Sequence, residues 1–178
     1  MTMVRGLLAT ALLLLSVAAP GCAPAEPVEP TAPAVDTGPM TGVEKAYLEF
    51  VVSHLQTVNE DIALLEMLFS TPDFEDQYWQ ASVTTLLNRI EVVYQSLATL
   101  KPTERLQPFQ DASVSALQHA ASFVKLLRDM LAVDQTTLTE EAEQELIATG
   151  KAFGEADRLL TEFLEAHPVP DELKDNAS

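Results

Sequence analysis

Residues 48–69 read LEFVVSHLQTVNEDIALLEMLF, and this stretch decides the fold. Apolar residues recur along it at alternating steps of three and four, which places one side chain per turn on a single face of an α-helix. Further apolar residues beside this row widen it to the stripe of a bundle helix, beyond the narrower seam of a two-stranded coiled coil. The row consists of Leu48, Val51, Leu55, Val58, Ile62, Leu65 and Phe69.

Three later segments carry rows with the same spacing. The second row consists of Trp79, Val83, Leu86, Ile90, Val93, Leu97 and Leu100. The third consists of Phe109, Ser113, Ala116, Ala120, Phe123, Leu127 and Met130. The fourth consists of Ala142, Leu146, Thr149, Phe153, Ala156, Leu160 and Phe163. The sequence therefore predicts helices at about 42–70, 72–101, 103–134 and 138–167.

Short connections make consecutive helices antiparallel, and four apolar stripes bury one another most simply in a bundle. We therefore expect an all-α domain over residues 42–167, an up-down-up-down four-helix bundle. An array of another hand and a helix-swapped dimer are the alternatives.

The segment ends carry helix-boundary signals. Residues 70–73, Ser-Thr-Pro-Asp, predict an N-cap and a first-turn proline for the second helix. Pro108 requires a place in the first turn of the third helix. Thr137 and Glu140 form the pattern of a capping box for the fourth. Two prolines stop that helix and predict a frayed tail over residues 168–178.

The N-terminus, residues 1–22, reads MTMVRGLLATALLLLSVAAPGC. Arg5 precedes an apolar run, Leu7 to Ala19, that is too short to cross a bilayer of about 30 Å as a helix but fits a secretory signal. Small residues then lead directly into Cys22, the only cysteine of the chain.

This arrangement resembles the lipobox of bacterial lipoproteins. Gly21 and Cys22 match it, Ala19 fits where Leu is commoner, and Pro20 departs from the usual Ala, Ser, Thr or Val. The resemblance implies that residues 1–21 are a signal peptide that is removed. It also implies that Cys22 carries two or three acyl chains, palmitate among them, which anchor the protein at about 0.8 kcal/mol per buried methylene.

Ordinary secretion is the alternative, because residues 16–18 and 23–25 each form a small-x-small cleavage pattern. Both interpretations place the domain outside the cytoplasm, in the cell envelope or periplasm. Within the lipoprotein interpretation, Ala23 follows the cysteine where Asp would favour retention at the inner membrane. An outer membrane is therefore favoured if the cell has one.

Residues 22–41 join the lipidated cysteine to the bundle and are rich in proline. Such a run favours extended polyproline II at about 3.1 Å per residue, which gives a semi-rigid spacer of roughly 60 Å. We expect a disordered tether that holds the domain off the membrane. Recognition of its prolines by a partner stays open.

The chain has 10 Lys and Arg against 27 Asp and Glu, a net charge of −17. A surface of this sign repels phosphate and anionic headgroups, which disfavours nucleic acid and charge-driven lipid binding. A basic partner and loosely held divalent cations remain open.

Two histidines are weak candidates for metal or haem ligation. His54 and His119 lie beside the rows of the first and third helices, which run parallel in the expected topology and face a shared interior. Metal sites in bundles use Glu-x-x-His pairs, and the sequence contains none, so we expect neither metal nor cofactor. We expect His167 to bind the last carbonyls of its own helix.

No catalytic residue stands out. Ser113, Ser115 and Ser122 lie near His119 in the middle of a helix, without an oxyanion hole or a strained elbow. Gly150 and Gly154 predict the close approach of a neighbouring helix, with access for a partner or ligand as the alternative.

The sequence thus favours a membrane-anchored, non-enzymatic protein-interaction module whose partner is unknown. A bundle that binds a metal, haem or small apolar ligand in its core is the alternative.

Overall fold

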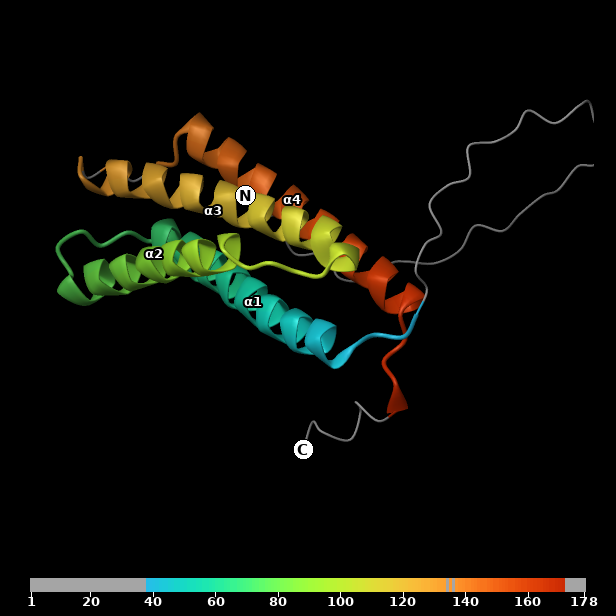
Figure 1. Cartoon of the computed structure of the whole chain (residues 1–178). Coiled ribbons are helices and arrows are strands. Elements are labelled where there is room, and N and C mark those ends of the chain that lie inside the picture. The colour runs from blue at the N-terminus through green and yellow to red at the C-terminus, as the bar shows by residue number, and fades with distance from the viewer. Residues whose placement is uncertain (1–37, 134, 136, 172–178) are drawn as a thin grey trace, which may run out of the picture. The chain divides into compact units, whose positions relative to one another are not determined.

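The computed structural model describes residues 38–133, 135 and 137–171. The predicted signal peptide, Cys22 and most of the predicted tether lie outside them. The helices are α1 (Gly42–Ser70), α2 (Gln77–Ala98), the short 3₁₀ helix η1 (Glu104–Leu106), α3 (Gln107–Leu131) and α4 (Glu140–Ala166). They form the predicted all-α, up-down-up-down four-helix bundle, with no strand in the described part of the chain (Figure 1).

The apolar rows of α1, α2 and α3 form the core. Every member of them is buried except the last residues of the first two rows, Phe69 and Leu100, which are partly buried. The row of α4 is buried only at alternate positions, because α4 packs along α3 and approaches α1 and α2 much less closely. Leu146, Phe153 and Leu160 are therefore partly exposed.

Helix α1 begins with a capping box that ties down the chain before it. The Thr41 hydroxyl accepts from the Glu44 amide at 3.2 Å, and the Glu44 carboxylate accepts from the Thr41 amide at 2.9 Å. Met40 is buried in the core with 3% exposure. The expected tether is therefore wrong over residues 38–41, which belong to the bundle.

Helix α2 begins later than predicted, since its N-cap is Asp76, whose carboxylate accepts from the Tyr78 amide at 2.9 Å. The indole N–H of Trp79 donates to the Leu68 carbonyl at 3.1 Å, and the connection between the helices wraps around that ring. Pro72 lies in this connection and not in a first turn. The helix also ends earlier, at Ala98, with Thr99 as its C-cap. Pro102 keeps only Lys101, the residue before it, out of the helical conformation.

The predicted boundaries of α3 and α4 agree with the structure only in part. Pro108 occupies the first turn of α3, as predicted, but the helix ends at Leu131 and not at residue 134. The cap of α4 is Thr139, whose hydroxyl accepts from the Ala142 amide at 3.1 Å. The predicted capping box with Thr137 is therefore wrong by two residues.

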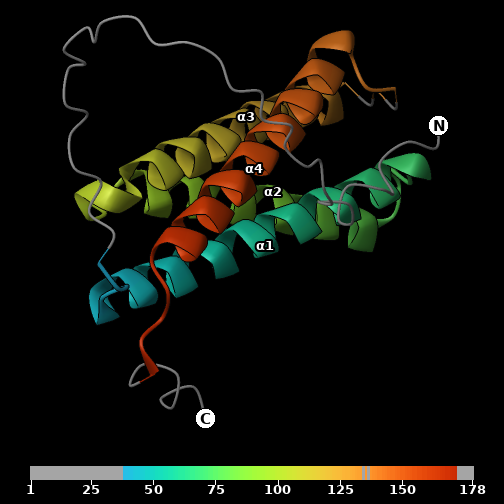
Figure 2. The ribbon, with the colours of Figure 1, turned by 90° about the vertical axis from the view of Figure 1, so that its right-hand side faces the viewer.

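The C-terminal end of α4 comes down beside the start of α1 (Figure 2). The Met40 amide donates to the Pro168 carbonyl at 3.3 Å, and Val169 packs partly buried against the core. The predicted frayed tail is thus wrong for residues 168–171; residues 172–178 lie outside the described part of the chain.

Candidate functional site

The two ends of the bundle differ. One carries the start of α1 and the end of α4 (Figure 1). We call it the proximal end, because Gly38, through which the N-terminal region joins the bundle, is bonded there to Arg105 and His167. The other carries the α1–α2 and α3–α4 connections, and we call it the distal end.

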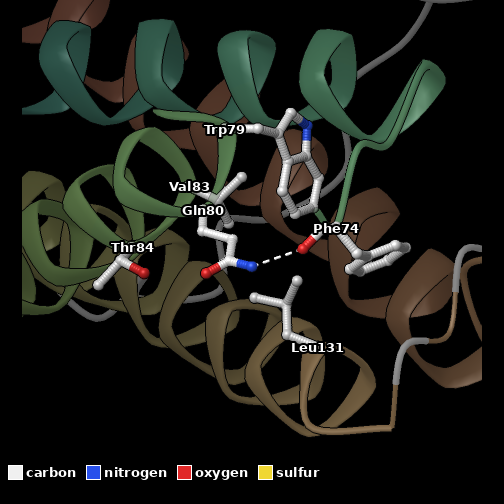
Figure 3. Close-up of a pocket in the computed structure, with 6 residues that line it drawn as sticks. All are labelled: Phe74, Trp79, Gln80, Val83, Thr84 and Leu131. Atoms are coloured by element: carbon white, nitrogen blue, oxygen red, sulfur yellow. Dashed lines mark hydrogen bonds between the residues drawn. The ribbon is translucent and has the colours of Figure 1, made fainter. Parts of the chain in front are cut away.

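An open hollow of about 250 Å³ lies at the distal end, between the α1–α2 connection, the first turns of α2 and the last residue of α3 (Figure 3). We call it the distal hollow. This volume is below the roughly 300–1,000 Å³ of sites for drug-sized ligands, so it suits a single large side chain better than a cofactor. Its lining residues are Phe74, Trp79, Gln80, Val83, Thr84 and Leu131.

The aromatic walls of the distal hollow are held in place. The Phe74 and Trp79 rings meet edge to face with centroids 5.1 Å apart, and the centroid of the Phe69 ring lies 5.7 Å from that of Trp79. The Gln80 amide lies among the apolar side chains and donates to the Phe74 carbonyl at 2.5 Å (Figure 3). Together with the bond from the indole to Leu68, these contacts fix the walls before anything binds.

Large apolar side chains are exposed on the segments of the distal end. Tyr78 is 84% exposed in the first turn of α2, Met67 is 59% exposed near the end of α1, and Val133 is 69% exposed just after α3. Aromatic residues and methionine are enriched at protein interfaces, where buried aromatic anchors supply much of the affinity.

The proximal end is closed by a cluster of paired polar groups, the proximal cluster. The Glu44 carboxylate, 1% exposed, accepts from Thr103 at 2.9 Å and from the Arg105 guanidinium at 2.7 and 3.0 Å. Burial raises the pKa of Glu44, but the hydrogen bonds from Thr41, Arg105 and Thr103 outweigh it and lower that pKa to about 2. The cluster therefore joins α1 to η1 with a charged pair that stays ionised at physiological pH.

His167 also belongs to the proximal cluster. Its Nδ1 lies 2.8 Å from the Gly38 carbonyl, which also accepts from Arg105 at 3.1 Å. Only its backbone N–H bonds within its own helix, to Phe163 at 2.9 Å. The expected bond to the last carbonyls of α4 is thus made by the His167 backbone, whereas its ring contacts the carbonyl of Gly38 in the incoming chain.

No protein-family model, curated protein or solved structure matches this chain. Among the residues that the structure describes, no helix has both the length and the apolar composition needed to cross a bilayer. The described domain is marked instead by the contrast between its ends, one closed by paired polar groups and the other open and lined by aromatic rings.

The histidines that we considered as ligands lie in separate local contacts. His54 Nδ1 is 2.8 Å from the Phe50 carbonyl one turn earlier, and the centroids of the two tilted rings lie 4.2 Å apart. His119 Nδ1 is 2.8 Å from the Glu145 carboxylate on α4. Within residues 38–133, 135 and 137–171, no group of three or more His, Cys, Asp or Glu side chains is arranged to hold a metal ion.

The serines and glycines singled out in the sequence also have defined places. Ser113 is fully buried and donates to the Phe109 carbonyl at 2.7 Å, whereas Ser115 and Ser122 are partly exposed.

Gly150 and Gly154 lie on the exposed face of α4, where an added Cβ would meet nothing within 4 Å. The predicted close approach of a neighbouring helix is therefore wrong, because only α3 packs closely on α4.

Two polar contacts between helices were not predicted from the sequence. Asp61, fully buried on α1, accepts two hydrogen bonds from the Arg89 guanidinium of α2. The Tyr47 hydroxyl donates to Gln110, whose amide donates to the Leu97 carbonyl at 2.7 Å. Burial, with a contribution from the charge of Asp111, raises the pKa of Tyr47 to about 12. These contacts fix the register of the neighbouring helices.

A second hollow, of about 290 Å³, lies between α2 and α3 beside Tyr94, Lys125 and Arg128. The Arg128 guanidinium is already engaged, because it donates to Asn88 at 2.7 Å and to Glu91 at 3.2 Å. We therefore place the candidate site at the distal hollow.

Proposed function

We propose that this protein is a membrane-anchored lipoprotein whose helical bundle acts as a non-enzymatic protein-interaction module outside the cytoplasm. The observation that carries the proposal is the position of the distal hollow. It lies at the end of the bundle opposite Gly38, where the N-terminal region is attached. A domain anchored through its N-terminal region keeps that end accessible to a partner.

The anchoring part of the proposal rests on the sequence of the first 37 residues. A short apolar run ends at the only cysteine of the chain, Cys22, and a proline-rich stretch follows it. With residues 38–41 assigned to the bundle, the spacer shortens to residues 23–37, or roughly 45 Å in polyproline II.

The binding part rests on the chemistry of the distal hollow. Its walls are two aromatic rings and two aliphatic side chains, with an amide and a hydroxyl beside them. Rigid aromatic anchors of this kind carry interface affinity, whereas catalysis needs a nucleophile or an acid–base pair within reach of a substrate. Protein binding is therefore the activity that the residues of this hollow support best.

Site-specific photo-cross-linking in intact cells tests this proposal. A photoreactive phenylalanine analogue at Thr84, an exposed lining residue of the distal hollow, should give a discrete cross-linked species of higher mass. The same analogue at Lys101, which is exposed at the proximal end, is the matched control and should give none. If Thr84 and Gln80 both fail to cross-link in the processed protein, the proposal is wrong.

A further inference from the structure

We infer that the distal hollow binds a cationic segment of a partner protein. The segment inserts one large apolar side chain between Phe74, Trp79 and Leu131 and sets lysines or arginines against the acidic residues of the distal end. This inference rests on the proposed function, since it specifies the chemistry of the partner.

The charge of the distal end carries the first step. The sequence contains no Lys or Arg between residues 46 and 88, and none between residues 129 and 150. In the antiparallel bundle, these two stretches supply both connections and all four helix ends of the distal end. Their described acidic residues from the second half of α1 onward are Glu60, Asp61, Glu66, Asp73, Glu75, Asp76, Asp129, Glu140, Glu141, Glu143 and Glu145.

Two arginines border these stretches, and neither is available to neutralise the distal connections. Arg89 is bonded to the buried Asp61, and Arg128 donates to Asn88 and Glu91. Asp73, Glu75 and Asp76, in the connection that supplies Phe74, therefore have no basic side chain near them in sequence. The negative potential of these carboxylates attracts a positively charged partner and repels other copies of this acidic chain.

The distal hollow supplies the second step. Trp79, one of its apolar walls, is only 6% exposed, while Gln80 and Thr84 lie exposed beside it. An incoming aliphatic or aromatic side chain gains contact with the Phe74 and Trp79 rings and with Leu131 without rearranging them (Figure 3). The apolar side chain then supplies most of the affinity, and the acidic surroundings supply orientation and the choice of partner.

The structure also provides a reporter for the test. Trp79 is the only tryptophan of the chain, so tryptophan emission comes from the wall of the distal hollow alone. The probe is a short peptide with lysines on both sides of a single p-nitrophenylalanine, whose ring quenches tryptophan at close range. Added to the full-length protein in non-ionic detergent, it should quench the emission with an affinity on the order of micromolar. Raising NaCl from about 50 to about 300 mM should weaken binding several-fold.

Matched peptides separate charge from apolar contact. The same peptide with glutamate in place of lysine should not quench. Unlabelled lysine peptides should displace the probe when their central residue is leucine, and should do so at least about tenfold less well when it is serine.

Two pairs of exposed variants locate the site. Glu75→Lys should weaken binding about fivefold or more, whereas Glu165→Lys, the same change at the proximal end of α4, should alter it less than about twofold. Thr84→Arg should abolish quenching, whereas Thr99→Arg, at the other end of α2, should leave it intact. Circular dichroism checks that all four variants keep their helical content.

Equal quenching by the lysine and glutamate peptides would overturn the inference, as would equal effects of Glu75→Lys and Glu165→Lys. Equal competition by the leucine and serine peptides would show that the distal hollow plays no part. If Thr84 cross-links in cells but the lysine peptide does not bind, the inference fails and the proposed function stands. If neither Thr84 nor Gln80 cross-links, the proposed function itself fails.

Discussion

At the scale of single residues, one buried carboxylate holds three parts of the chain together. Glu44 bonds to Thr41 at the start of its own helix, to Thr103 before η1 and to Arg105 within η1. Its pKa of about 2 lies below the ordinary value of 4.5, because those bonds outweigh burial. Since the folded pKa is lowered, Glu44 stabilises the fold fully above about pH 4.5, and this stabilisation is lost as the pH falls towards 2.

We therefore expect Glu44→Gln to lower the free energy of unfolding by about 3 kcal/mol at pH 7 and by roughly half as much at pH 3. The amide loses the charge and turns an N–H₂ group towards the Thr and Arg donors. Urea unfolding at both pH values measures the difference. Glu49→Gln, on the exposed side of the same helix, should change the free energy by less than about 0.5 kcal/mol at either pH. The same loss for Glu44→Gln at both pH values would contradict this account.

A second prediction at this scale concerns Cys22, which lies outside the described residues. Mass spectrometry of the membrane fraction should find residues 1–21 absent and Cys22 acylated. Cys22→Ala should shift the protein out of that fraction. An unmodified N-terminus at Ala19 or Glu26 would show ordinary secretion instead.

At the scale of elements, α4 is the helix whose apolar row is least covered. Its two glycines lie on the uncovered side, and each costs about 1 kcal/mol relative to alanine in a helix interior. Because an added Cβ meets nothing there, the described domain gives no packing reason for either glycine.

The double change Gly150→Ala/Gly154→Ala should therefore raise the free energy of unfolding by about 2 kcal/mol, as measured by urea unfolding. Ala156→Leu, on the opposite, buried face of α4, is the control and should destabilise the protein by about 1–3 kcal/mol. A loss of stability in the glycine double variant would indicate that another surface covers this face in solution.

Periodicity predicted the elements well where packing follows one face, as along Val51, Val58 and Leu65, all fully buried. It placed the start of α1 at residue 42, where the helix begins, but missed the start of α2. The choice between the competing caps Ser70 and Asp76 is decided by contacts outside the helix, here the bond from Trp79 to Leu68. The spacing also places Trp79 in the core row. Whether its ring lines an open hollow depends on Phe74 and Leu131, which only the tertiary fold brings together.

The charge of the distal end shows the same limit. The stretches without Lys or Arg are visible in the sequence, but they lie more than 40 residues apart, and only the antiparallel order of helices brings them to one end. The proximal cluster was not predicted from the sequence either, although Thr41 and Glu44 have the spacing of a capping box.

At the scale of the whole molecule, the folding unit extends beyond the four helices. Met40 fills part of the core, Thr41 caps α1, and Pro168 accepts from Met40. A fragment of residues 38–171 should therefore melt cooperatively, as followed by circular dichroism. A fragment of residues 42–166 should lose about 2–4 kcal/mol of stability, because it lacks the cap and the contacts of His167. Identical melting of the two fragments would contradict a role for the flanking residues, and a non-cooperative melt of the longer one would refute independent folding.

The bond between Met40 and Pro168 also makes the bundle a candidate for circular permutation. Because the two ends of the domain already touch, a short linker can join them, and new termini can be opened in the α3–α4 connection. An anchor at the new N-terminus of such a permutant would attach to the distal end and place the distal hollow next to the bilayer. Under the proposed function, this permutant should keep its fold and its membrane attachment but lose binding to its partner.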